Sequence, residues 1–145
     1  MATRNLQPVH GESAVDRKQL FSPGVEVVAL YDGDCALCRS SVDWLRTRDT
    51  NHRIFPVALQ TPGVLRTFHL TRAQAEGEMH AYDRNGEHRS GADAVLWAVS
   101  LLPRFSTLRP LYKLPGAMPI ARFVYRQIAR RRGLSACDGA GCRPQ

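Results

Sequence analysis

Two cysteines spaced three residues apart, Cys35 and Cys38, carry the clearest chemical signal in the sequence. A thiolate can attack a disulfide bond, and a second thiol one helical turn away can then close a new disulfide and release the product. The same Cys-x-x-Cys spacing also supplies half of a zinc site. The local structure decides between the two uses, because a strand before the pair and a helix after it are typical of redox motifs.

The segments around the cysteines fit that redox context. Residues 25–31 are almost continuously apolar and rich in valine, which predicts a strand buried on both faces, and residues 35–48 have the spacing of an amphipathic helix. Cys35 is therefore expected in the first helical turn, where free backbone N–H groups and the helix dipole stabilise an anion. We expect the pKa of Cys35 to lie moderately below the value of about 8.5 of a free cysteine, because the adjacent carboxylate of Asp34 opposes a larger decrease.

Two carboxylates, Asp32 and Asp34, lie between the strand and the cysteines. Either could accept a proton from Cys38, or they could serve only as caps of the strand end or the helix. Asp-x-Asp after an apolar strand also resembles the nucleophile motif of haloacid-dehalogenase-type phosphatases. That site needs later acidic residues for magnesium, and the only acid after Asp93 is Asp138. The sequence therefore disfavours a phosphatase.

The rest of the chain supplies the elements that must position the pair. We expect a second strand at residues 53–59, where Pro56 favours an edge position, and a short helix near residues 64–68. Further elements are a hairpin of residues 79–83 and 87–90 around Asn85-Gly86, a helix from residue 90 or 91 to 102, and a last helix over residues 119–132. This order predicts an α/β domain, with a mixed sheet flanked by helices and additional C-terminal helices.

At this point the sequence resembles a known family. The segment from Asp32 to Cys38 resembles the Asp-x-x-Cys-x-x-Cys signature of the DCC family of predicted thiol-disulfide oxidoreductases. Gly91-Ala92-Asp93-Ala94 resembles the family's Gly-x-Asp-Ala element, and residues 114–116, 119–121 and 125–132 resemble its C-terminal helix region. The resemblance covers residues 27–134 in the expected order.

The resemblance implies a thioredoxin-like fold in which Cys35 is the attacking thiol and Cys38 the resolving thiol, with no cofactor. It also implies two partners, a disulfide-containing substrate and a thiol that donates or accepts electrons. The sequence departs from ordinary thioredoxins in two respects. Asp34 precedes the cysteine pair, where an aromatic residue is usual. The active site of thioredoxins is completed by a proline at the start of the third strand, and the corresponding place, near Glu78 and Met79, has none. Thiol exchange is therefore expected as chemistry, whereas the choice of partner is left open.

Length and composition fit one soluble domain. The 145 residues divide into an expected flexible lead-in at 1–22, the domain at 23–134 and a tail at 135–145. The sequence has neither the run of about 20 apolar residues that a membrane-spanning helix needs nor the apolar core of a signal peptide. We therefore expect a cytoplasmic protein, in which paired cysteines suggest catalysis or metal more than a structural disulfide.

The net charge of +7 is concentrated in the C-terminal part. Residues 94–137 contain eight basic residues and no acidic one. In the expected last helix, apolar residues (Ile120, Phe123, Val124 and Ile128, with Ala121 and Tyr125) and arginines (Arg122, Arg126 and Arg130 to Arg132) occupy different faces. The simplest interpretation packs the apolar face on the domain and leaves the arginines in solvent. The alternative interpretation is that the helix binds an acidic protein or an anionic membrane. The sequence contains no recognisable module that reads nucleic-acid bases, so we expect no nucleic-acid partner.

A second cysteine pair, Cys137 and Cys142, lies in the glycine-rich tail. These thiols could be incidental, could exchange electrons with Cys35 and Cys38, or could complete a four-cysteine zinc site. The competing class of function is accordingly a zinc- or partner-binding module without catalysis. Zinc would block the nucleophile, so the two classes are mutually exclusive at Cys35.

Overall fold

The computed structural model describes residues 15–113 and 116–135, and its centre is a four-stranded sheet. The strands are β1 (Val27–Tyr31), β2 (Ile54–Ala58), β3 (His80–Asp83) and β4 (His88–Ser90). Their order is β2-β1-β3-β4, with β2 parallel to β1 and the other two pairs antiparallel. The predicted α/β class with a mixed sheet is confirmed, and the arrangement is thioredoxin-like.

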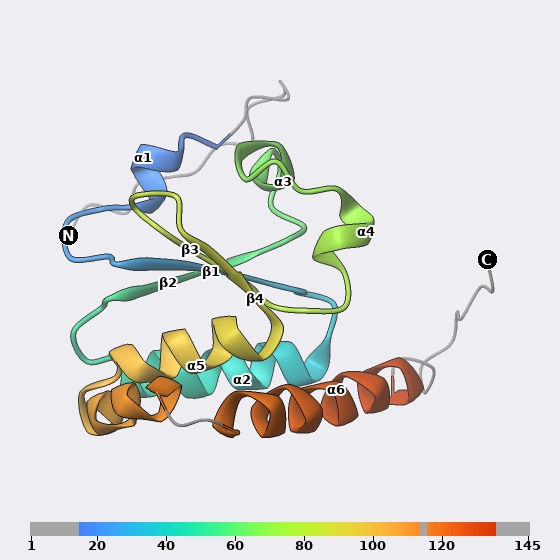
Figure 1. Ribbon diagram of the computed structural model, residues 1–145. Coiled ribbons are helices and arrows are strands. Elements are labelled where there is room, and N and C mark those ends of the chain that lie inside the picture. Colours follow the sequence, from blue (N-terminus) through green and yellow to red (C-terminus); the bar gives the residue numbers. More distant parts are fainter. Residues whose placement is uncertain (1–14, 114–115, 136–145) are drawn as a thin grey trace.

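Helices cover both faces of the sheet (Figure 1). One face carries the short helices α1 (Arg17–Leu20), α3 (Val64–Thr67) and α4 (Arg72–Ala75), and the other carries α2 (Ala36–Arg48) and α5 (Gly91–Leu101). A 3-10 segment, η1 (Pro103–Lys113), leads to α6 (Ala117–Ser135), which packs against α5 as an outer layer. The additional C-terminal helices are therefore present.

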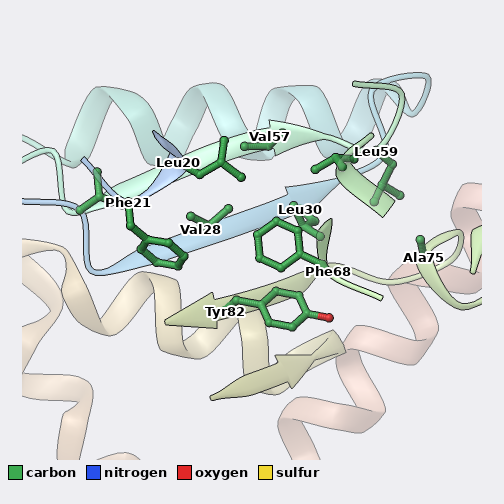
Figure 2. Packing of buried hydrophobic residues seen from close by; sticks show 11 residues of the cluster. Leu20, Phe21, Val28, Leu30, Val57, Leu59, Phe68, Ala75 and Tyr82 are labelled. Carbon is green, nitrogen blue, oxygen red and sulfur yellow. The ribbon is translucent and has the colours of Figure 1, made fainter. Parts of the chain in front are cut away.

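The continuous apolar character of β1 follows from its position between two cores. Val28 and Leu30 point into the core under α1, α3 and α4, where Figure 2 shows them beside Phe68 and Tyr82. The alternate residues Val27 and Ala29 lie in the second core, under α2 and α5. All four side chains are at most 1% exposed. Strand β1 is therefore the centre of the domain, and the loop after it has a rigid base.

Part of the expected lead-in belongs to this core. Leu20 and Phe21 are 7% and 6% exposed and pack with the cluster on the α1 side, and Arg84 donates a hydrogen bond to the carbonyl of Phe21. Polar residues surround this apolar pair in the sequence, so the sequence pattern did not predict its burial. The predictions for residues 1–14, and for the tail with Cys137 and Cys142, concern residues outside the described part of the chain.

Helix α6 differs from its prediction in the face that it buries. It begins at Ala117, and its anchors are the Tyr125 hydroxyl, which accepts the N–H of Met79 at 3.0 Å, and Arg122, which pairs with Asp93 at 2.9 Å. Four of the six apolar side chains that were expected to pack are instead exposed, by 67% for Ile120, 59% for Phe123, 49% for Val124 and 42% for Ile128. The expectation of an apolar-packed helix was wrong for these four residues, whereas Tyr125, from the same expected face, contacts the domain together with the polar pair of Arg122 and Asp93.

Candidate active site

Cys35 is the N-cap residue of α2. Its backbone is extended (φ −83°, ψ 115°), and its Sγ accepts a hydrogen bond from the N–H of Cys38 at 3.2 Å. An N-cap side chain normally supplies an oxygen to the free N–H groups of the first turn. Here a sulfur takes that place, so a thiolate at Cys35 would meet an N–H donor and the positive end of the helix dipole. The predicted position at the helix start is confirmed.

The resolving thiol of the predicted pair lies in the first turn of the same helix. Cys35 and Cys38 are not joined by a disulfide in the structure, and both are half-buried. The described segment therefore holds them one turn apart without hiding either thiol. Leu37, between them, is 45% exposed and gives the surface beside the pair an apolar patch.

One side chain, Gln60, organises the loop between β1 and the cysteines. Its Nε2 donates to Asp32 Oδ1 at 2.8 Å and to Asp34 Oδ2 at 3.0 Å, while its Oε1 accepts the N–H of Gly33 at 2.9 Å. Asp32 Oδ1 also accepts the N–H of Asp34 at 3.0 Å. The close approach favours glycine, because a Cβ on Gly33 would lie 2.8 Å from Gln60 Oε1 and 3.2 Å from the Ala58 Cβ and would displace the Gln60 amide.

The structure thus brings together both predicted carboxylates, but through a residue that sequence reasoning missed. The contacts described for Asp32 and Asp34 are those of loop organisation, and a role in proton transfer stays a prediction. The role of Gln60 can be predicted only when the order and direction of the strands are known. Strands β1 and β2 are parallel and pair Tyr31 with Ala58, so residues just after the two strands meet at one edge.

Two arginines interact with this acidic loop. Arg39 donates to the carbonyl of Gly33 at 2.7 Å, and the first turn of α2 contains no acidic residue. The pKa of Arg72 is raised, mainly by its hydrogen bond and charge pairing with Glu76 and to a smaller extent by the carboxylates of Asp34 and Asp32. Two guanidinium groups therefore act on the loop, one on a carbonyl and one on the carboxylates.

The segment before β3 lies next to the end of β1, because Leu30 pairs with His80. The sequence has no proline here, and the N–H of Met79 is used by Tyr125 of α6. Helix α6 therefore contacts the backbone segment that neighbours the cysteine loop.

Neither a metal site nor a membrane-spanning helix is found in the part of the chain that the structure describes. Within residues 15–113 and 116–135, no group of three or more histidine, cysteine or acidic side chains could hold a metal ion. None of the helices described there is both long enough and apolar enough to cross a bilayer.

A Cys-x-x-Cys pair at the start of the helix after the central strand of a mixed sheet is the arrangement of thioredoxin-like redox proteins. The family model described as DCC1-like thiol-disulfide oxidoreductase matches residues 29–137. The chain belongs to this DCC1-like thiol-disulfide oxidoreductase family, as the sequence motifs predicted. No curated protein and no solved structure matches the chain.

Proposed function

We propose that this protein is a thiol-disulfide oxidoreductase in which Cys35 is the nucleophile and Cys38 the resolving thiol. The observation that carries the proposal is the Sγ of Cys35 at the N-cap of α2, within hydrogen-bond distance of the N–H of Cys38. Membership of the DCC1-like family supports the same chemistry.

The proposed reaction has two displacements. The Cys35 thiolate attacks one sulfur of a substrate disulfide, an enzyme–substrate disulfide forms, and the other substrate sulfur leaves as a thiolate that takes a proton. Deprotonated Cys38 then attacks the Cys35 sulfur, which closes the Cys35–Cys38 disulfide and releases the second substrate thiol. The substrate disulfide gains two electrons and the cysteine pair loses two. A dithiol donor restores the pair by the reverse exchange, and the reducing cytoplasm is the proposed compartment.

The test is a redox titration of the full-length protein in glutathione buffers, with thiols counted by alkylation. To remove the tail thiols from the count, Cys137 and Cys142 are both replaced by serine in the parent. We expect a two-electron transition in the parent and none in Cys35→Ser. With a disulfide substrate, Cys38→Ser should accumulate the mixed disulfide on Cys35, because the resolving step is lost.

Two results would overturn the proposal. One is a Cys35 whose alkylation rate at neutral pH equals that of a free cysteine, and the other is a pair that never closes in oxidising buffer. Metal analysis of the freshly purified full chain, before the tail cysteines are replaced, addresses the competing function. One zinc per chain that is lost in Cys35→Ser would favour the binding module over the enzyme.

A further inference from the structure

The outer face of α6 combines an apolar stripe with a basic stripe. Ile120, Phe123, Val124 and Ile128 follow the spacing i, i+3, i+4 and i+8, so they share one face of the helix, and all are at least 42% exposed. The stripe from Ile120 to Ile128 is about 12 Å long at the rise of an α-helix. Four adjacent large apolar side chains on a surface helix indicate an interaction site.

The basic stripe lies beside the apolar one. Arg122, Arg126 and Arg130 follow one another at intervals of four residues and are exposed. Within the described part of the chain, Arg122 is paired with Asp93, whereas Arg126 and Arg130 form no ion pair. Arg131 and Arg132 continue the helix, and residues 94–137 contain no acid.

The domain leaves the apolar stripe, Arg126 and Arg130 exposed to solvent. The hydroxyl of Tyr125 accepts the N–H of Met79, and Arg122, at the edge of the basic stripe, bonds to Asp93, which fixes that side of the helix against α5 and the start of β3. Figure 1 shows α6 as the outermost layer, beyond α2 and α5. The helix is therefore presented with its free faces toward solvent.

We propose that α6 lies in the surface of an anionic phospholipid membrane, with its apolar stripe among the acyl chains and its arginines at the phosphates. A helix with one large apolar face and a cationic flank is the form of an interfacial helix, because it satisfies both requirements of that surface along its length. This inference is independent of the proposed chemistry at Cys35.

Charge complementarity favours lipid over the other occupants. If a second copy packed symmetrically on the same stripe, the arginines of the two helices would meet without an acid on either helix. An acidic protein would pair with the arginines but would need its own apolar groove for four side chains. An anionic bilayer offers negative charge for the arginines and an apolar interior for the four side chains.

The test is co-sedimentation of the full-length protein with vesicles. One set contains phosphatidylcholine alone, and the other contains phosphatidylcholine and phosphatidylglycerol in equal amounts. We expect binding to the anionic set that weakens as NaCl is added. The double variant Arg126→Gln/Arg130→Gln should bind about thirtyfold more weakly, from the typical contribution of each arginine near a charged surface. Ile120→Gln/Phe123→Gln should lose at least about tenfold.

Matched controls use the same substitutions on other elements. Phe55→Gln changes a phenylalanine on β2 that is 40% exposed, and Arg46→Gln/Arg66→Gln removes two exposed arginines, one on α2 and one on α3. Both should bind like the wild type, and circular dichroism checks that every variant is folded. Phe123→Trp should show a blue-shifted emission difference on binding, because the ring enters the acyl region.

Three outcomes would overturn the proposal. They are no preference for anionic vesicles, equal losses in the α6 variants and in their controls, or a lipid-free dimer in dilute buffer, without added NaCl, that Ile120→Gln/Phe123→Gln dissociates. Cys35→Ser should bind vesicles like the wild type, so failure of the redox proposal and failure of this one are distinguishable.

Discussion

At the scale of single residues, Gln60 has the largest share in shaping the loop before Cys35. It joins two carboxylates and one backbone N–H, and it follows β2 and not β1. The loop that orients the cysteines is thus held from the neighbouring strand. Its geometry depends on the pairing of β1 with β2 as well as on the motif itself.

Replacing Gln60 with leucine tests this role. Leucine keeps most of the volume but makes none of the three hydrogen bonds, so we expect a loss of about 1–2 kcal/mol in the free energy of unfolding. The alkylation rate of Cys35 should also change, because Asp34 is no longer held. Urea unfolding and timed alkylation measure the two effects.

A matched control is Gln74→Leu, which removes an exposed glutamine from the capping box of α4. It should reduce stability without changing the reactivity of Cys35. If Gln60→Leu and Gln74→Leu had the same effect on Cys35, the loop would not depend on the side chain of Gln60.

At the scale of elements, the hairpin of β3 and β4 contains a histidine pair. His80 Nε2 lies 2.9 Å from the carbonyl of Gln74 and His80 Nδ1 lies 3.0 Å from His88 Nε2, which together require a single N–H between the rings. His88 also stacks on Tyr82 at 4.4 Å. Partial burial, and then the charge of His80, lower the pKa of His88, while Glu78 acts in the opposite direction.

This pair predicts a loss of stability in acid. The unfolded chain takes up a proton on His88 near its ordinary pKa of about 6.5, whereas the folded chain resists that proton, so the unfolded state binds more protons. The contribution of His88 to the free energy of unfolding is therefore complete above about pH 6.5 and falls as the pH decreases through that value. Urea unfolding at about pH 7.5 and about pH 5.5 should show lower stability at the acid value.

Substitution identifies the source of that pH dependence. His88→Gln should weaken it, and His52→Asn, at an exposed position with φ 51°, should leave it unchanged. Greater stability at the acid pH in the wild type would contradict the prediction.

The junction of α6 with the start of β3 is a second element-scale feature. Tyr125→Phe keeps the ring beside Gly91 but leaves the partly buried N–H of Met79 without its acceptor. We expect a loss of about 1 kcal/mol in the free energy of unfolding. Faster amide exchange at Met79 and in α6 would locate the effect, whereas unchanged exchange there would show that the hydroxyl does not anchor the helix.

Sequence patterns predicted the elements better than their contacts. The apolar run at residues 25–31, the turn at Asn85-Gly86 and the cysteine spacing are local signals, and each corresponds to the element expected. Gln60 was missed because it meets Asp32 only through strand pairing. The packing of α6 was mispredicted because amphipathicity says which residues share a face and does not say which face meets the domain.

At the scale of the whole molecule, the charge of +7 and the apolar stripe of α6 act against each other. Repulsion between like-charged copies keeps the stripes apart at low ionic strength, and salt screens that repulsion. We therefore expect a monomer in dilute buffer and weak self-association as NaCl increases, measured by sedimentation velocity.

The double variant Ile120→Gln/Phe123→Gln should remain monomeric at every salt concentration, and Phe55→Gln should associate like the wild type. Association that decreased with added salt would contradict this prediction, because it would mean that opposite charges hold the copies together.

Finally, the edges of the sheet matter for a protein gathered on a surface. Strand β2 forms one edge and carries Pro56, which offers no backbone N–H, and β4 forms the other edge with only three residues. Copies confined to two dimensions collide far more often than copies in bulk solution. Because Pro56 interrupts one edge and the other edge is short, the sheets of crowded copies can hardly pair edge to edge into a continuous sheet. A dense layer of this protein should therefore stay fluid.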